Sequence, residues 1–389
     1  MKIFNLRIGG DSWIWSIALI LSISSLLLIF SSTEALSYRY QDGNTLYYLN
    51  RQFIFLLIGW ALMIWVHRWN YNLFAYLSRV FIWLAIIILP LTLLWGVNEN
   101  AASRRLMLPL IGVTFQPSDF AKVALIMYLA RSISKYQHSI MRQSTVSHLR
   151  EFLNMAGPVI AVCLLIVPEN LSTAIIVFIT SLILMFIGKV YYKYILSLLG
   201  LSVLGALFLV GSLYLLPENM LMNRMLTWKH RIDNFYQPTD GPADQTVEAM
   251  VAIVEGGFLG SMPGNNVQVK FLTHAYSDFI YTVVLSEYGI WGGIAVILLY
   301  LTLIIRTLII FRQSPGAFGA LLAVGLSLSI GIQAFFHMAV NVNLVPVTGI
   351  PLPMMTMGGT SIIIACFTLG MILSVSRHIE ENKRLKLDT

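Results

Sequence analysis

The sequence predicts an all-α polytopic membrane protein with ten transmembrane helices and a large extracytoplasmic loop between helices 7 and 8. Of its 389 residues, 57% are hydrophobic and 11% are charged, against about 45–50% and about 25% in soluble proteins. The apolar residues gather in runs of about 20, the length that crosses a membrane. This composition excludes an ordinary cytosolic enzyme, a disordered protein and a nucleic-acid-binding domain.

The predicted spans follow one another with mostly short connections, and residues 1–389 form one integral membrane domain. The fourth span begins at Gln116-Pro117-Ser118-Asp119, and Pro168-Glu169 between the fifth and sixth predicts a tight helical hairpin. No cleavable signal peptide is expected, because the first run is long enough to span. The spans are expected at about residues 12–31, 52–67, 72–96, 116–131, 153–167, 170–187, 191–214, 278–305, 317–340 and 354–376.

The positions of Lys and Arg predict the orientation of the chain. With the N-terminus in the cytoplasm, most basic residues fall on the cytoplasmic side. The short outer loops then hold only Arg39, Arg51, Arg104 and Arg105. Both termini are therefore predicted to be cytoplasmic, and the net charge of +7 faces lipid head groups rather than nucleic acid.

Residues 215–277 form the large outer loop, which is far longer than ordinary connections and is therefore expected to be functional or disordered. It contains Gly256-Gly257-Phe258-Leu259-Gly260 and a small apolar block at Ala249–Val254. The glycine run predicts a shaped backbone rather than a loose tether.

Asp119 and Lys122 lie three residues apart at the outer end of the fourth span. This spacing places them on one helix face, where they can pair. The pair is either a structural contact between helices or part of a ligand site. In a ligand site, Lys122 presents an ammonium group to a phosphate and Asp119 holds it charged and oriented.

Asp278 and Glu287 are acidic residues at the start of the eighth span, on opposite faces of the helix. Ionisable groups at membrane depth are costly and face a cavity or a partner by default. For Asp278 the alternative role is a helix N-cap. For Glu287 it is a buried, hydrogen-bonded carboxylate.

Three further segments combine polar residues with Pro or Gly beside predicted spans. They are Ala102–Arg105, Glu169–Thr173 and Asn343–Pro353, the last followed by Gly358–Ser361. Non-helical backbone at membrane depth is tolerated only where protein or a watery cavity covers it. The third segment is therefore a candidate re-entrant loop, with a plain outer turn as the alternative.

The sequence lacks several familiar motifs. It has no metal-ligand cluster, no phosphate-binding G-x-x-x-x-G-K-[ST] loop and no G-x-S-x-G elbow. Cys163 and Cys366 lie in apolar runs and are predicted to be small core residues. Catalysis driven by ATP within this chain is therefore not expected.

Together these segments resemble the SEDS family (shape, elongation, division and sporulation), which includes FtsW, RodA and SpoVE. The resemblance extends over nearly the whole chain and is closest to the FtsW division branch. Arg231 to Gly260 resembles the start of the family's large loop. Phe115–Lys122 resembles F-Q-P-S-E-x-x-K, Ser277–Ile280 resembles part of H-T-D-F-I, Asn343–Pro353 resembles P-V-T-G-x-P-L-P and Gly358–Ser361 resembles G-G-S-S.

The chain departs from the family pattern at several positions. Asp119 replaces Glu and keeps the charge, Ser286 replaces the first acid of E-E-x-G, and Tyr276 replaces the His before the catalytic motif. Asn170 and Ser172 replace Asp and Gly of P-D-x-G-T. None of these changes removes the carboxylate of Asp278.

The resemblance implies a peptidoglycan glycosyltransferase that polymerises lipid II into glycan strands during cell division. It implies an inverting transfer, with Asp278 as general base and undecaprenyl pyrophosphate as leaving group. Lys122, Arg104 and a divalent cation (Mg²⁺ or Mn²⁺) are candidates for balancing the pyrophosphate charge; no covalent cofactor is expected. The other predicted substrate-binding residues are Asp119, Gln116, Ser118, Thr348, Pro353, Gly358 and Gly359, with Glu287, Asn170 and Thr173 in supporting roles.

The resemblance also implies partners and a location. The partners are lipid II, the nascent glycan, a class B penicillin-binding protein (FtsI-like) and other division proteins, and the location is the bacterial inner membrane with the active site facing outside. Two rival functions stay open: a lipid II flippase or transporter, and a non-catalytic scaffold for the penicillin-binding protein. No clear inverted repeat supports the transporter.

Overall fold

The computed structural model describes residues 2–3, 6–7, 9–40, 42–95, 97–99, 102–108, 113–140, 145–215, 223–236, 245–272 and 274–387. The chain folds as two compact units. The first comprises Met1–Tyr71, Asp240–Pro315 and Leu326–Thr389, and the second comprises Asn72–Thr239 and Gly316–Gly325. The helix α12 begins in the second unit and continues in the first.

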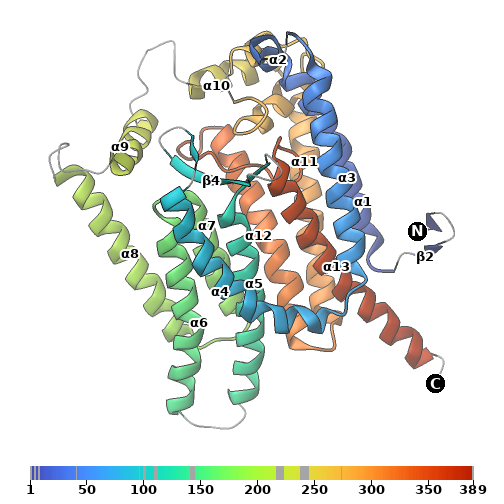
Figure 1. Ribbon diagram of the computed structural model, residues 1–389, viewed down its shortest axis with the longest axis vertical. Helices are drawn as coiled ribbons and strands as arrows, with labels where there is room; N and C mark the ends of the chain where they lie inside the picture. Colours follow the sequence, from blue (N-terminus) through green and yellow to red (C-terminus); the bar gives the residue numbers. More distant parts are fainter. Residues whose placement is uncertain are drawn as a thin grey trace. The chain divides into compact units, whose positions relative to one another are not determined.

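Long apolar helices form the core of the first unit. Helix α13 packs along α3, and α1 packs against both α3 and α11 (Figure 1). The amino-terminal segment contributes a two-stranded antiparallel hairpin in which Lys2 pairs with Arg7. The elements are β1 (Lys2–Ile3), β2 (Leu6–Arg7), α1 (Ser12–Ser32), α2 (Glu34–Tyr40), α3 (Thr45–His67), α10 (Gln245–Gly256), the 3₁₀-helix η2 (Gln268–Lys270), α11 (Ile280–Gln313), α12 (Ala317–Asn341) and α13 (Gly359–Leu387).

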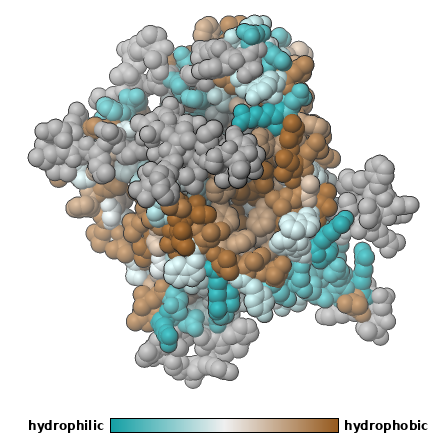
Figure 2. Space-filling view, viewed as in Figure 1, coloured by the Kyte–Doolittle hydropathy of each residue, from teal (hydrophilic) through white to brown (hydrophobic). Residues whose placement is uncertain are grey.

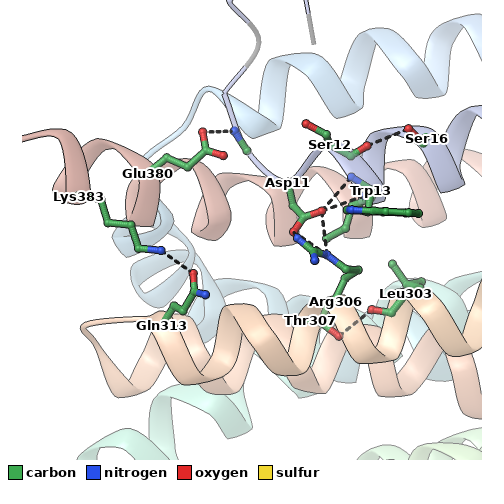
Figure 3. Close-up of polar contacts among 12 residues, drawn as sticks. Asp11, Ser12, Trp13, Ser16, Leu303, Arg306, Thr307, Gln313, Glu380 and Lys383 are labelled. Atoms are coloured by element: carbon green, nitrogen blue, oxygen red, sulfur yellow. Dashed lines mark hydrogen bonds and ion pairs between the residues drawn. The ribbon is translucent and has the colours of Figure 1, made fainter.

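Contacts at both ends tie α1 to α11. At its start, Asp11 caps α1 by accepting hydrogen bonds from the Trp13 and Ile14 amides at 2.9 and 3.4 Å. The same carboxylate pairs with Arg306 of α11, with Nη2 and Oδ2 2.5 Å apart (Figure 3). At the other end of α1, Ser31 donates a hydrogen bond to Glu287 of α11. The two helices therefore run antiparallel between these contacts.

Helix α11 is interrupted at Gly289, whose φ of 66° and ψ of −164° are not helical. The segment that follows α10 satisfies main-chain groups at the break: the Ser261 and Met262 amides donate to the oxygens of Ser286 and Glu287 at 2.9 and 3.1 Å. The approach is so close that a Cβ on Gly260 would lie 2.2 Å from the Glu287 oxygen. Glycine is therefore required where this segment crosses α11.

The second unit combines a helical bundle with a small sheet. Helix α5 packs against α6 and α7, and β4 lies between β3 and β5 in an antiparallel sheet. Proline lies inside α4 at Pro90 and inside α6 at Pro158. The elements are α4 (Tyr71–Trp95), β3 (Val97–Glu99), β4 (Ala102–Leu108), β5 (Val113–Phe115), α5 (Pro117–Ile140), α6 (Thr145–Ile166), α7 (Leu171–Ile187), α8 (Tyr192–Leu215) and α9 (Asn223–Tyr236).

Within the described residues, eight helices are long and apolar enough to cross a membrane: α1, α3, α4, α6, α8, α11, α12 and α13. Helix α7 is apolar but shorter. Many bulky apolar side chains on these helices are exposed, such as Trp83 at 65% and Phe208 at 80%, and hydrophobic residues cover broad areas of the face drawn in Figure 2. Such exposure is costly in water and is expected for surfaces that face lipid.

Each of the ten predicted spans overlaps one helix, but several boundaries differ. Helix α3 begins at Thr45 rather than near 52, and α13 begins at Gly359 rather than near 354. Helix α11 continues to Gln313, past the predicted end near 305. The later start of α13 has a physical reason, because residues 342–358 form a non-helical segment held by side chains of other elements, as described below.

The predicted loop at 215–277 contains helices. Helices α9 and α10 and the 3₁₀-helix η2 lie in it, which agrees with the expectation of a shaped backbone. Residues 216–222, 237–244 and 273 of this loop lie outside the described residues. The sequence interpretation did not anticipate the sheet of β3, β4 and β5 or the short helix α2.

Candidate active site

Asp278 lies at the end of a turn that leads into α11. The Ser277 and Asp278 amides donate to the His274 oxygen at 3.1 and 3.0 Å. The N-cap of α11 is Phe279, which makes no side-chain cap hydrogen bond. Among the described residues, none donates a hydrogen bond to the partly buried Asp278 carboxylate or pairs with it as a cation. The alternative role of Asp278 as a helix cap is therefore wrong for this structure.

Asn341, the last residue of α12, contacts the main chain around Asp278. Its Nδ2 donates to the Asp278 main-chain oxygen at 3.0 Å. Its Oδ1 accepts from the Thr282 amide at 2.9 Å and from the Thr282 hydroxyl at 3.1 Å. Asn341 and Thr282 are 1% and 0% exposed, so these hydrogen bonds form away from solvent. Sequence reasoning missed Asn341, because its partners are distant in the chain.

His337 connects Asn341 to the segment after α12. Its Nδ1 lies 2.7 Å from the Ile350 main-chain oxygen, and a carbonyl oxygen only accepts, so Nδ1 carries the proton. The other ring nitrogen, Nε2, then accepts from Asn341 Nδ2 at 3.3 Å. These contacts assign the neutral tautomer protonated at Nδ1. The i, i+4 spacing of His337 and Asn341 was the one sequence signal for this pair.

Asn343–Pro353, the candidate re-entrant loop, lies within a non-helical segment, residues 342–358, that joins α12 to α13. Its main-chain oxygens accept hydrogen bonds from buried side chains: Ile350 from His337, Pro351 from Gln333 at 2.8 Å, and Pro353 from the Tyr300 hydroxyl. Side chains of two helices, α11 and α12, thus satisfy backbone groups that an open turn would leave to water. The segment is therefore a non-helical loop anchored by buried side chains.

The loop at residues 342–358 also contacts the turn before Asp278 and helix α1. The Met357 amide donates to the Tyr276 oxygen at 3.0 Å, two residues before Asp278. Ser25 of α1 donates to the Met355 oxygen at 3.1 Å. Of the predicted substrate-binding residues in this loop, Thr348 and Pro353 are buried and Gly358 is partly exposed, as is Gly359 at the start of α13.

Glu287 is a buried carboxylate, 2% exposed. Its Oε1 accepts from Ser31 and from the Gly264 amide, the latter at 3.1 Å. Its Oε2 has no hydrogen-bond partner among the described residues. This geometry fits the alternative role of Glu287, a hydrogen-bonded carboxylate that joins α1, α11 and the segment after α10.

Asp119 and Lys122 form an ion pair in the first turns of α5. Lys122 Nζ lies 3.3 Å from Asp119 Oδ1, and the two side chains are 12% and 6% exposed. Asp119 stands in the first turn of α5, where the helix dipole favours a negative charge. Ahead of it, Gln116 donates to the hydroxyl of Ser118 at 3.2 Å. Asp119 therefore holds the Lys122 ammonium in a largely buried position.

Asn170 and Thr173 lie at the start of α7. Asn170 is the N-cap, and its Oδ1 accepts from the amides of Ser172 and Thr173 at 3.1 and 3.3 Å. The preceding Glu169 is 2% exposed and accepts from Thr92 of α4. Asn170 therefore fixes the hairpin between α6 and α7 through local capping.

Arg104 lies in β4, where its neighbour Arg105 pairs with Val97 of β3. The Arg104 side chain lies outside the described part of the structure. The predicted site residues divide between the two units. Arg104, Gln116, Ser118, Asp119, Lys122, Asn170 and Thr173 belong to the second, and Asp278, Glu287, Thr348, Pro353, Gly358 and Gly359 to the first.

The chain belongs to the cell cycle protein family of FtsW, RodA and SpoVE, whose pattern it matches over residues 11–381. It is 33% identical over 343 residues to a probable peptidoglycan glycosyltransferase FtsW from Nitrosococcus halophilus, with 86% of this chain and 84% of that protein covered. It is 30% identical over 383 residues to a protein of the same name from Geobacter sp. (strain M18), with 95% and 98% covered.

Solved structures share the fold. A chain from a structure described as "Structural coordination of polymerization and crosslinking by a peptidoglycan synthase complex" aligns with a TM-score of 0.72 at 21% identity, covering 95% of this chain and 98% of that one. The Thermus thermophilus rod shape determining protein RodA aligns with a TM-score of 0.67 at 19% identity, covering 95% and 98%. The protein therefore has the fold of these polytopic membrane proteins.

Proposed function

We propose that this protein is a peptidoglycan glycosyltransferase that polymerises lipid II during cell division. The observation that carries the proposal is the Asp278 carboxylate, which stands at the start of α11 with no hydrogen-bond donor or cation engaging it among the described residues. The names of the FtsW relatives support the reaction class. A carboxylate in this state can accept a proton from a substrate hydroxyl.

The contacts between α1 and α11 support a position for Asp278 outside the hydrocarbon layer. From Asp11 to Ser31 on α1, and from Glu287 to Arg306 on α11, the rise is about 30 Å, which equals the thickness of the hydrocarbon core. The first residue of α11, Ile280, precedes Glu287 by a further rise of about 10 Å, and Asp278 lies in the turn just before it. With Arg306 on the cytoplasmic side, Asp278 then lies among the outer head groups, at the level of the sugars of a lipid-linked substrate.

In this topology all ten predicted spans cross the bacterial inner membrane, including α5 and α7. Both termini are cytoplasmic, and the loop that holds α9 and α10 is extracytoplasmic. Lys and Arg near α11, α12 and α13, such as Arg312 and Arg377, favour this orientation.

The proposed reaction is an inverting transfer. The Asp278 carboxylate takes the proton of the acceptor hydroxyl, whose oxygen forms a bond to the anomeric carbon of the donor. The bond from that carbon to the pyrophosphate oxygen breaks, and undecaprenyl pyrophosphate leaves with the electron pair. Because the donor arrives activated, the step needs no nucleotide.

The leaving pyrophosphate needs positive charge. We assign this role to Lys122, held by Asp119, and to Arg104. Within the described residues there is no group of three or more His, Cys, Asp or Glu side chains that could hold a metal. A divalent cation would therefore take most of its ligands from the pyrophosphate and water, as Mg²⁺ does in many phosphate sites.

A class B penicillin-binding protein is the proposed partner. The structural neighbour from a peptidoglycan synthase complex supports an assembly of this kind. Other division proteins and the nascent glycan complete the proposed set.

The test is polymerisation of lipid II by the purified full-length protein in detergent or liposomes, with and without a class B penicillin-binding protein. Glycan strands should form without ATP and without an ion gradient. Movement of lipid II across liposomes without polymer would favour a flippase. If this protein forms no polymer by itself but raises the rate of an added polymerase, it acts as a scaffold.

A further inference from the structure

The first turn of α11 is capped by a residue from another helix. The N-terminal amides of a helix lack intrahelical acceptors, and the N-cap side chain usually accepts from the second or third of them. In α11 the N-cap is Phe279, which offers no acceptor. The third amide, that of Thr282, donates instead to Asn341 Oδ1 of α12 at 2.9 Å.

The Asn341 amide has one orientation that satisfies all its neighbours. The Thr282 amide can only donate, so it requires the amide oxygen of Asn341, which also accepts from the Thr282 hydroxyl. The NH₂ group then faces three acceptors: the Asp278 oxygen, the His337 oxygen and His337 Nε2, at 3.0, 3.0 and 3.3 Å. Asn341 therefore accepts from the helix start and donates to the residue that precedes the cap.

We propose that Asn341 is a positioning residue for Asp278. By capping α11 in trans, it supplies the acceptor that an acidic residue at a helix start would otherwise provide, and this leaves the Asp278 carboxylate uncommitted. By donating to the Asp278 main-chain oxygen, it also fixes where that carboxylate stands. This role rests on the proposed function, in which Asp278 is the general base.

The arrangement also links Asp278 to the loop at 342–358. His337 accepts from Asn341 at one ring nitrogen and donates to the Ile350 oxygen at the other. The loop end reaches the turn before Asp278 through the hydrogen bond from the Met357 amide to Tyr276. Asp278 is thus linked to this loop in two places, through the buried side chains of Asn341 and His337 and through the turn at Tyr276.

Substitution of Asn341 tests whether this residue positions Asp278 for the reaction or contributes to the binding of lipid II. In Asn341→Ala the Thr282 amide loses its acceptor, and the Asp278 carboxylate is free to turn back to it. Because misplacing a reacting group by about 1 Å costs about a hundredfold in rate, we expect kcat for lipid II polymerisation to fall by about tenfold to a hundredfold. Affinity for lipid II, measured in the inactive Asp278→Asn background, should stay within about twofold.

Two further variants control for stability. Thr307→Ala removes another buried hydrogen bond between α11 and α12, in which the Thr307 hydroxyl donates to Ser327 at 2.6 Å, and Thr307 is distant in the chain from Asp278 and from the loop at 342–358. It should leave kcat within about threefold of wild type. Asn341→Asp keeps the acceptor for Thr282 and loses the donor to Asp278, so it should fold and show an intermediate kcat.

The outcomes are distinct. The inference is overturned if Asn341→Ala keeps the wild-type kcat, if its loss appears equally in lipid II affinity, or if Thr307→Ala loses as much kcat. If Asp278→Asn itself polymerises at the wild-type rate, the proposed function fails instead. Loss of kcat in Asn341→Ala, with unchanged affinity for lipid II and a fully active Thr307→Ala variant, supports the inference.

Discussion

Arg306 of α11 lies against Asp11 at the start of α1, with Nη2 2.5 Å from Oδ2 and Nε 3.0 Å from the same oxygen. The Asp11 side chain is 6% exposed and also caps α1. Removing the arginine leaves a buried carboxylate without its cation, which is costly. Since the Arg306 side chain is 29% exposed, water offsets part of that cost.

Arg306→Ala is therefore expected to lower stability by about 1–3 kcal/mol, seen as a lower melting temperature of the purified protein. Lys383→Ala serves as the control, because Lys383 makes an exposed hydrogen bond to Gln313 at the end of the same helix (Figure 3). Equal melting temperatures for Arg306→Ala and wild type would contradict this role for the pair.

Gly260 is expected to tolerate no side chain. In Gly260→Ala the new Cβ would meet main-chain atoms of Glu287 and Gly289, at 2.2 and 2.6 Å, and these cannot move aside cheaply. Gly257 is the matched control, because it has a similar positive φ with nothing within 4 Å of an added Cβ. Gly257→Ala should cost about 1 kcal/mol from backbone strain alone, and Gly260→Ala clearly more, as measured by thermal unfolding. Equal losses of stability in Gly260→Ala and Gly257→Ala would contradict the close approach of Gly260 to α11.

Glu287 is expected to stabilise the protein by accepting hydrogen bonds rather than by carrying a negative charge. Two groups, the Ser31 hydroxyl and the Gly264 amide, donate hydrogen bonds to its Oε1. Glu287→Gln keeps an oxygen for these donors, whereas Glu287→Ala leaves the buried Gly264 amide unpaired at a cost of about 1–3 kcal/mol. We predict that Glu287→Ala has the lower melting temperature. A Gln variant as unstable as the Ala variant would show that the charge itself is needed.

The spans were predictable because length and hydropathy decide which segments cross a membrane. The candidate residues Asp278, Asp119 and Lys122 were also visible in the sequence, since charges are rare in these helices. The ion pair of Asp119 and Lys122 followed from their spacing on one helix face, and the structure contains it.

The contacts around Asp278 were not predictable in the same way. The sequence allowed Asp278 as an N-cap, because Ser-Asp before an apolar run is a common helix start. The actual cap comes from Asn341, which is 59 residues from Thr282 in the chain. A tertiary contact of this kind leaves no local pattern. The start of α13 was placed too early for a related reason, since the apolar residues before Gly359 belong to a loop held by distant side chains.

Substitution of Lys122 is expected to lower the rate of the transfer step more than substitution of Asp119. Lys122→Ala should lower kcat for lipid II polymerisation by about a hundredfold, because it removes the positively charged side chain that stabilises the departing pyrophosphate. Lys122→Arg keeps the charge and should retain more of the rate. Asp119→Glu restores the residue that the family carries at this position and should remain active. Full polymerisation by Lys122→Ala would remove this residue from the proposed mechanism.

The rate of lipid II polymerisation by purified Asp278→Asn protein, measured beside wild type, tests the central claim most directly. Asparagine keeps the size of the side chain and removes the base, so the rate should fall by at least about a hundredfold, with the melting temperature unchanged. Glu255→Gln, which changes an exposed carboxylate of helix α10, should polymerise at the wild-type rate. Wild-type polymerisation by Asp278→Asn would contradict the assignment of Asp278 as the general base.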